Sequence, residues 1–311
     1  MFDLNKYVIS DKNGYLETNI NNIDDLIELI RPDKNNCIQL MRKANPLNEE
    51  IDLDEHCIFR GQADSAWKLT PSLFRLNSEK IFSKFLSFEK TLINTFEYYC
   101  DNSEISIPGD SLQRRKQRLD TYLRSVSDDS GFKFDENDFE LLAFAQHYGV
   151  PTRLLDWSYQ PLVSLYFAAI EAVRLIDLKV DTSETLLKKS FSLWVVSAEQ
   201  LLSCENIELL EVPASNNNHL SRQAGCFTVV KEFQTPPNFM NYSPKTLEQV
   251  LQENNLSRIL LKINVDLRVA ARAVYYCSSY GFDGAKLFGG ANGAARSCND
   301  WLLFQKIAAL K

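Results

Sequence analysis

The segment from Ala143 to Ile170 constrains the fold more than any other part of the chain, because it places polar residues among apolar ones that must be buried. An apolar-periodic helix ends at the Gly-Val-Pro turn of residues 149–151, and a short strand-like run follows. A second helix then begins, with either Ser158 or Gln160 as its N-cap and Pro161 in its first turn. The sequence therefore predicts a unit of helix, tight turn, buried strand and helix.

Four polar side chains lie inside this unit, namely His147, Arg153, Asp156 and Ser158. Leu, Trp, Phe and Val residues flank them and would be costly to expose. A charge in apolar surroundings must be paired or hydrogen-bonded. We therefore expect Arg153 and Asp156 either to have protein partners or to face a ligand.

The composition excludes several classes of protein. A formal net charge of -7 over 311 residues argues against binding of nucleic acid or anionic membrane by bulk electrostatics. The seven cysteines show no CxxC spacing and the three histidines no HExxH spacing, which favours reduced cysteines and no metal site. No apolar run reaches the length of a membrane span, and the first residues lack the layout of a signal peptide. These features predict a soluble, cytoplasmic protein.

Apolar runs along the rest of the chain predict one α/β (α+β) domain over residues 1–311, with a single twisted mixed sheet flanked by helices. Residues 1–50 are expected to be an N-terminal lead-in, and residues 77–146 a helical insertion bracketed by strands. The expected strands cover 7–10, 57–62, 152–157, 191–197, 221–230 and 259–265; helices are expected over 22–31, 78–100, 247–254 and 269–279, and a Gly-rich loop over 286–293.

One concentrated basic run, QRRKQR, covers residues 113–118. A run of like charges is more often a solvated helix face than a phosphate-binding patch. We therefore assign it no function from the sequence.

Several short blocks together carry a family resemblance. Phe59-Arg60-Gly61 is followed by Gln62, and a second block runs from Gln146 to Ser158 with a break at Val150. Pro161 to Ala168 and Arg222 to Thr228 add two more. Over about residues 55–300 the sequence resembles the FRG domain family, which is named for Phe-Arg-Gly and carries no firmly assigned activity. The chain departs from the family at Leu287-Phe288, where the family more often continues with Pro-Asp.

The order of these blocks is also similar to that of ADP-ribosyltransferase-like folds, which we take as the leading fold hypothesis. In such folds an early strand carries Arg or His, a hydroxyl or Tyr precedes a helix, and a later strand carries an acid. Arg60, Ser158 and Gln223 occupy these places, but Gln223 has no negative charge, so Asp156 or Glu232 would have to supply the acid.

The resemblance implies NAD as substrate, with no metal, and a ribose cation that forms as nicotinamide leaves. The catalytic candidates are then Arg60, Asp156, Ser158 and Gln223. The candidates for binding NAD or another nucleotide are Arg60, Gln62, His147 and Arg153.

Structural roles compete with each of these assignments. Arg60 and Asp156 can form an ion pair that only holds the fold together, His147 can cap a helix, and Gln223 can be a buried hydrogen-bonding amide. A Cys/His nucleophile is disfavoured, because His56 and Cys57 are adjacent and lack an evident partner.

Three classes of function remain. The first is a transferase or glycohydrolase that uses NAD, as a bacterial toxin or antiphage effector acting on a protein or nucleic-acid target. The second is a non-catalytic module that binds a nucleotide, a nucleic acid or a protein. The third is a structural or sensor domain. The first two require that the polar residues line an open cleft, whereas the third allows them to be paired and dry.

Three predictions follow for the folded protein. Phe59 and Leu155 should be buried on adjacent strands of one sheet. Arg60 and Arg153 should approach a common cleft whose third wall is the strand around Gln223. If Asp156 pairs in a low-dielectric interior, Asp156→Ala should cost about 3 to 5 kcal/mol of stability.

Overall fold

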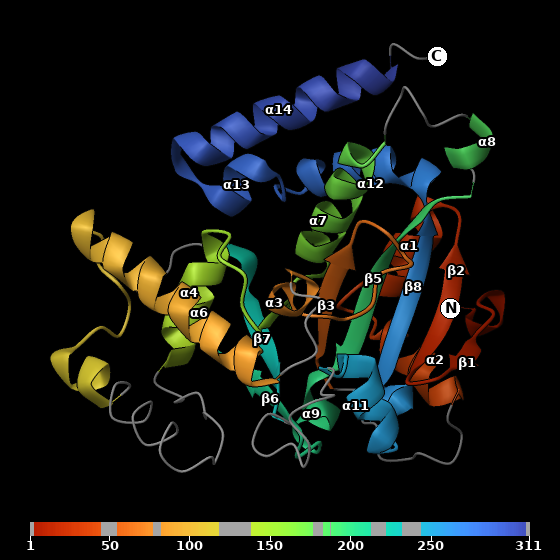
Figure 1. Ribbon diagram of the computed structural model, residues 1–311. Helices are drawn as coiled ribbons and strands as arrows, with labels where there is room; N and C mark the ends of the chain where they lie inside the picture. The colour runs from red at the N-terminus through yellow and green to blue at the C-terminus, as the bar shows by residue number, and fades with distance from the viewer. Residues whose placement is uncertain are drawn as a thin grey trace.

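The computed structural model describes residues 3–44, 55–76, 82–117, 138–176, 183–186, 188–212, 222–231 and 244–308. Within these residues eight strands form one open mixed sheet in the order β1-β2-β8-β5-β3-β4-β7-β6 (Figure 1). The strands are β1 Ser10–Lys12, β2 Tyr15–Ile20, β3 Cys57–Gln62, β4 Leu155–Ser158, β5 Ser190–Ser197, β6 Ile207–Leu210, β7 Gly225–Val230 and β8 Leu260–Asp266. The protein is therefore a mixed α/β fold, as the sequence predicts.

The N-terminal residues contribute directly to this sheet. Strands β1 and β2 form a hairpin at one edge, and β2 runs parallel to β8, whereas the other described neighbours are antiparallel. The predicted strand at residues 7–10 is wrong, because β1 begins only at Ser10. Tyr7 is instead buried, and its hydroxyl donates to the carbonyl of Asp25 at 3.1 Å.

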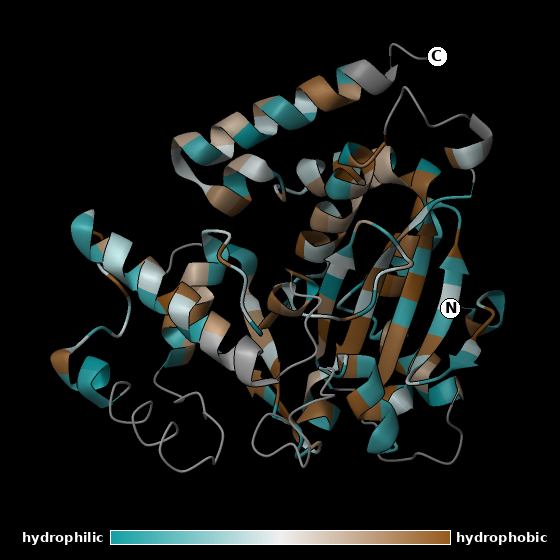
Figure 2. Ribbon diagram, in the orientation of Figure 1, coloured by the Kyte–Doolittle hydropathy of each residue, from teal (hydrophilic) through white to brown (hydrophobic). Residues whose placement is uncertain are grey.

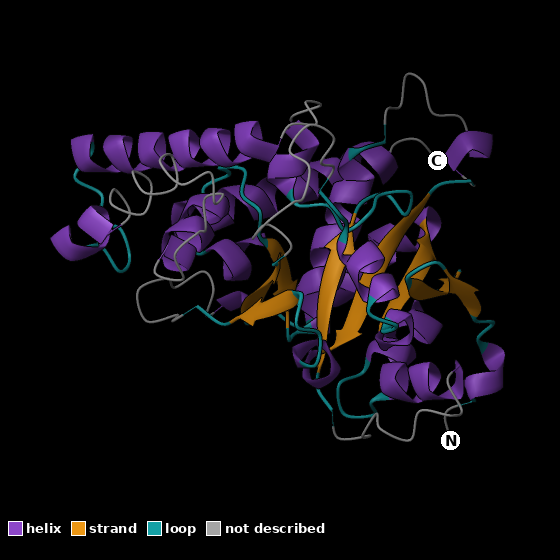
Figure 3. Ribbon diagram, turned by 60° about the horizontal axis from the view of Figure 1, so that its bottom comes forward, coloured by secondary structure: helices purple, strands orange, loops and turns teal. Residues whose placement is uncertain are grey.

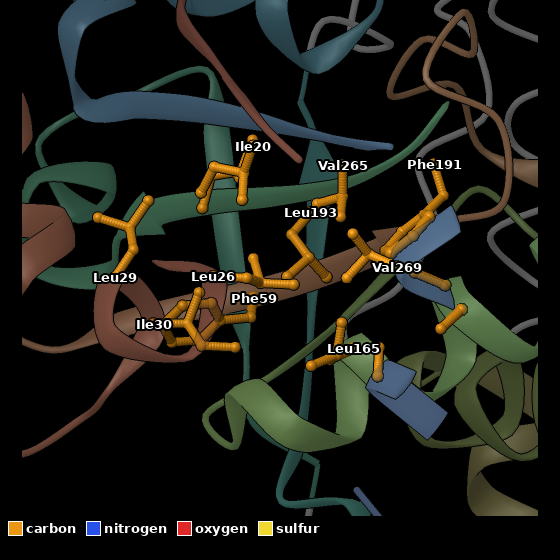
Figure 4. Close-up of a cluster of buried hydrophobic side chains, with 14 of the residues drawn as sticks. Ile20, Leu26, Leu29, Ile30, Phe59, Leu165, Phe191, Leu193, Val265 and Val269 are labelled. Atoms are coloured by element: carbon orange, nitrogen blue, oxygen red, sulfur yellow. The ribbon is translucent and has the colours of Figure 1, made fainter. Parts of the chain in front are cut away.

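Helices cover one face of the sheet and enclose the largest core cluster (Figure 4). These helices are α1 Ile23–Ile30, α2 Asn36–Ala44, α7 Pro161–Arg174 and α12 Ala270–Ser279. The Asn22 side chain caps α1, since it accepts from the backbone amide of Asp25 at 2.8 Å. Phe59, Phe191, Leu193 and Val265 from the strands meet Leu165 from α7 in this core.

The opposite face carries smaller helices, α9 Ala198–Leu202 and α11 Leu247–Glu253, over Ile58, Trp194 and Leu260. Figure 3 shows the strands as one twisted layer with helices on both sides. The connecting segments contain further short helices, namely α3 Ser72–Leu76, α8 Ser183–Leu186 and the 3₁₀ turns Leu4–Lys6, Ser257–Ile259 and Leu267–Val269.

The predicted helical insertion packs over one end of the sheet (Figure 1). It contains α4 Phe82–Asn102 and α6 Phe139–His147, which bury Ile93 and Leu142 against Leu154, Phe227 and Val229 near β4 and β7. It thereby covers the strands that lie beyond β3.

A break in the pairing between β3 and β4 positions the site described below. Phe59 and Leu155 are buried on these two neighbouring strands, which confirms the first prediction. In the described strands, however, β3 pairs with β4 at Phe59 and Ser158, but with β5 at six positions from Cys57 to Gln62. The sheet therefore opens between β3 and β4 beyond that point.

The expected Gly-rich loop at 286–293 is wrong, because this segment joins two helices. They are α13 Gly284–Phe288 and α14 Gly290–Ala308. Asp283 caps α13 by accepting from the amide of Lys286 at 2.9 Å, and Gly289, at φ +62°, separates the helices. Figure 2 shows hydrophobic residues concentrated on the central strands, whereas α14 carries both polar and apolar residues.

None of the helices in the described ranges is long and apolar enough to cross a membrane.

Gly61 allows α7 to approach β3 closely. A Cβ built there would lie 2.1 Å from the backbone oxygen of Ser164, which cannot move independently of its helix. We therefore expect Gly61→Ala to destabilise the fold by about 1 to 3 kcal/mol through overpacking. Urea unfolding measures this cost, and an unchanged midpoint with an unchanged slope would contradict the close approach.

Candidate functional site

A cavity of about 220 Å³ lies where the sheet opens between β3 and β4. Residues of β3, β4, β7, α6, α7 and α13 line it, together with Gln223. Phe59, Trp157, Phe167, Phe227 and Phe288 supply aromatic lining. Arg60, His147, Asp156, Ser158 and Gln223 supply polar lining.

An ion pair spans the opening. Arg60 Nη1 donates to Asp156 Oδ1 at 2.6 Å and to the backbone oxygen of Asp156 at 2.8 Å. The Gln146 amide also donates to Asp156 Oδ1 at 3.2 Å, and its oxygen accepts from the Thr152 hydroxyl. The Arg60 side chain is 11% exposed and that of Asp156 is 64% exposed, so the pair lies at the rim of the cavity and not in a dry interior.

The two charged groups at this rim differ in how fully they are hydrogen-bonded. Among the described residues, the buried Nε of Arg60 has no hydrogen-bond partner. Desolvation by surrounding protein raises the pKa of Asp156, but the charge and hydrogen bond of Arg60 outweigh it and hold that pKa below its usual value. Asp156 is therefore ionised at neutral pH.

A second cation, Arg75 at the end of α3, belongs to the same electrostatic cluster. Burial lowers the pKa of Arg75, the positive charge of Arg60 lowers it further, and Asp156 raises it. Sequence reasoning missed Arg75, because no local pattern in residues 62–75 marks it.

Ser158 joins β4 to the start of α7 and to residue 223. Its hydroxyl donates to the backbone oxygen of Gln223 at 2.6 Å and accepts from the amide of Gln160 at 2.9 Å. Gln160 is the N-cap of α7 and Pro161 its first residue, which decides between the two caps that the sequence leaves open. In this structure Ser158 therefore holds together backbone segments that border the cavity.

Gln223 and His147 border the cavity from two other segments. The Gln223 amide donates to the backbone oxygen of Leu287 at 3.4 Å, which links the segment before β7 to α13. His147 is the last residue of α6, and its ring meets that of Tyr148 edge to face at 5.2 Å. Five of the predicted site residues thus come together around one space.

Arg153 lies elsewhere, and the expectation that it shares a cleft with Arg60 is wrong. Its Nε donates to Glu89 Oε2 at 2.8 Å, and its Nη2 forms a second bond to the same carboxylate. The two side chains are 5% and 0% exposed. A buried guanidinium needs a charged partner, and that partner comes from α4.

Gln62, another predicted residue, does not line the cavity. Gln62 accepts a hydrogen bond from the Trp194 indole at 2.7 Å and donates to the backbone oxygen of Lys68 at 3.0 Å, so it connects β3 to β5 and to a loop. Glu232, the alternative acid, lies outside the described residues.

Two arginines of the basic run belong to a network of ion pairs. Arg114 is buried and bonds Glu97 at 2.6 Å and Asp110 at 3.0 Å. Arg115 forms two bonds to Asp101, at 2.6 Å and 2.8 Å. Both arginines are therefore committed to acids, whereas Gln113, Lys116 and Gln117 are exposed, as expected of a solvated face.

A second, more polar cavity of about 570 Å³ lies by Trp67, Glu248 and Lys262. Lys262 is buried, its Nζ lies 5.0 Å from the centre of the Trp194 ring, and burial lowers its pKa. None of the residues predicted from the sequence lines this cavity. Across the described ranges, no group of three or more His, Cys, Asp or Glu residues is arranged to hold a metal ion.

The two ion pairs should differ sharply in their contribution to stability. Glu89→Gln leaves the buried Arg153 charge without its partner and should cost about 3 to 5 kcal/mol. A similar cost at Asp156 is conditional on a low-dielectric interior, and that condition is not met because the Asp156 side chain is mostly exposed. Asp156→Asn should therefore cost about 1 kcal/mol or less. Urea unfolding of both variants measures the contrast, and equal costs would contradict this assignment of burial.

Comparison with known proteins identifies part of the chain. Residues 55–174 match the FRG domain family model, whereas no curated protein and no solved structure matches. The likeness to ADP-ribosyltransferase folds thus stays a hypothesis. The match is shorter than the expected 55–300: it includes Arg60, His147, Asp156 and Ser158 but ends before Gln223 and Phe288. The chain carries an FRG domain over residues 55–174, and this domain contributes most of the cavity's polar residues.

Proposed function

We propose that the cavity between β3 and β4 binds a nucleotide, NAD being the first candidate, and that the protein is an ADP-ribosyltransferase-like or NAD glycohydrolase-like enzyme. One observation carries the proposal. Arg60 from β3, His147 from α6, Asp156 and Ser158 from β4, and Gln223 from the segment before β7 line one cavity. A purely structural role for these residues would not require an open space between them.

The lining suits a ligand with a planar ring and phosphates. Phe59, Phe167 and Phe288 offer aromatic contacts inside, while Arg60 and Arg75 place positive charge near Asp156. Arginine binds phosphate oxygens through its planar fork. Arg60 donates through Nη1 to Asp156, whereas its Nε has no hydrogen-bond partner among the described residues. Because buried donors are normally hydrogen-bonded, this Nε supports the binding of a further acceptor.

Asp156 is the acid that best fits the chemistry. In the proposed reaction the bond between the ribose carbon and the nicotinamide nitrogen breaks, and its electron pair leaves with nicotinamide. Positive charge then develops on the ribose, and an ionised carboxylate at the rim stabilises it. Water or an acceptor nucleophile on a protein or nucleic-acid target forms the new bond to that carbon and loses a proton. An effector role in bacterial toxicity or antiphage defence is part of this proposal.

A non-catalytic nucleotide-binding module is the second candidate. It is favoured by the partners of the same residues: Asp156 is already paired with Arg60, and Gln223 donates its amide to a backbone oxygen. Such a site binds its ligand without turnover.

The test combines calorimetry with an assay for nicotinamide release. The wild-type protein should bind NAD and ADP-ribose, and Arg60→Lys should weaken binding at least roughly tenfold, because it keeps the charge but removes the fork. Arg31→Lys is the matched control, since Arg31 pairs with Asp33 on the exposed surface. Asp156→Asn should retain binding and lose nicotinamide release.

Two outcomes decide against the proposal. Absence of nucleotide binding by the wild-type protein, or equal binding by the wild-type and Arg60→Lys proteins, would overturn the nucleotide site. Tight NAD binding without nicotinamide release would leave the site in place and favour the non-catalytic module.

A further inference from the structure

Helix α13 contributes Phe288 to the wall of the cavity, and α14 packs against α13; both helices lie outside the segment that matches the FRG domain. Phe288, the last residue of α13, lines the cavity and meets the Phe167 ring of α7 edge to face at 5.7 Å. Gln223 holds the backbone oxygen of Leu287 beside it. The size of the cavity therefore depends on where α13 lies.

The two helices pack on each other as a unit. A Cβ at Gly284 would lie 2.9 Å from Arg296 Cβ, and one at Gly293 would lie 2.8 Å from the backbone oxygen of Ala285. The amide of Ala285 also donates to Ser297 Oγ at 2.8 Å. Such close contacts through glycines and backbone favour movement of α13 and α14 together.

The outer side of the unit faces solvent, and its apolar contacts with the other described residues centre on Leu287, which is fully buried in the main core, with Phe288, Leu303 and Phe304 partly buried beside it. Many side chains of α14 are exposed, including Trp301 and Leu302, and Figure 1 shows α14 lying over the outer end of α7. Asp300 is buried and provides the main polar attachment, since it accepts bonds from the Tyr166 hydroxyl and from Arg174, both on α7. Gly281, at φ +80° with open space around it, joins α12 to the unit.

Besides Asp300 and the chain connection at Gly281, Arg222 contacts the unit at the junction of its two helices. The Arg222 guanidinium covers Gly289, where a Cβ would lie 1.3 Å from Arg222 Nη1. Arg296 also lies 3.8 Å from the centre of the Phe288 ring. These contacts keep Phe288 against the cavity when the unit is in place.

We propose that α13 and α14 are a movable wall that pivots at Gly281, that Asp300 latches it to α7, and that Phe288 sets which part of a ligand the closed cavity holds. The cavity of about 220 Å³ is smaller than the roughly 300 to 1,000 Å³ of sites that enclose a drug-sized ligand. The closed state therefore encloses a single ring with its sugar, and a dinucleotide enters only when the wall opens. This statement about the ligand rests on the proposed function, whereas the movement of the wall does not.

Thiol labelling tests the movement without any ligand. Val163 is buried and lines the cavity, so Val163→Cys places a thiol behind the wall. In this background we expect Asp300→Ala to raise the rate of N-ethylmaleimide labelling at position 163 roughly tenfold, because hydrogen bonds to a charged group shift an equilibrium by about that factor. Mass spectrometry of peptides measures the rate at each cysteine.

The native buried cysteines Cys100 and Cys204 control for general loosening of the fold. They should stay protected in the Asp300→Ala protein. Gly289→Ala should act in the same direction by displacing Arg222, while Gly109→Ala, at a similar φ of +65° and facing Glu140, should have no effect at position 163. An unchanged rate at position 163, or a parallel rise at Cys100 and Cys204, would overturn the movable wall.

Addition of ADP-ribose separates this inference from the proposed function. If both hold, ADP-ribose should slow labelling at position 163 in the otherwise wild-type protein, and Phe288→Ala should weaken that protection. If Asp300→Ala accelerates labelling but ADP-ribose changes nothing, the wall moves and the nucleotide assignment fails.

Discussion

The ion pair between Arg60 and Asp156 is the interaction on which the site depends. It joins two strands at the point where their backbone pairing stops, so charged side chains replace the hydrogen bonds that a continuous sheet would make there. Apolar side chains at these two positions would pack together and fill the space, whereas the ion pair leaves it open. Because the pair lies at the rim, its charges stay available to a ligand while the surrounding strands remain fixed.

Comparison of the two central arginines shows why burial, and not residue type, decides their roles. Arg153 is buried together with Glu89, and its Nε and Nη2 both donate to that carboxylate. Arg60 donates to Asp156 through Nη1 alone, and the Asp156 side chain is mostly exposed. The first pair fastens the helical insertion to the segment before β4, whereas the second borders a space. One arginine thus belongs to the scaffold and the other to the rim of the cavity.

The sequence predicts the apolar strands well, because burial on both faces of a sheet demands continuous apolar runs. Residues 57–62 form β3 as predicted, and the run at 191–197 forms most of β5. The motif blocks bring Arg60, His147, Asp156, Ser158 and Gln223 to one cavity, but not Arg153, which the sequence predicts to lie there as well.

What the sequence could not predict depends on contacts between distant segments. Glu89 is 64 residues from Arg153 and lies on a helix of ordinary amphipathic pattern, so nothing marks it as the partner. The glycines of residues 289–293 suggest a loop, yet Gly289 forms the turn between two helices and Gly293 allows them to pack closely beside Phe288. The path of the chain after β3 brings the charge of Arg75 near Arg60 and Asp156, and local patterns do not specify that path.

Hydrogen–deuterium exchange with and without ADP-ribose tests the central claim most directly, because it reports where a nucleotide binds as well as whether it binds. The account predicts slower exchange in β3, in β4 and in α13, which border the cavity, and no change in α11. Protection near Lys262 and α11 alone, or no protection anywhere at saturating ADP-ribose, would contradict the claim that the opening between β3 and β4 is a nucleotide site.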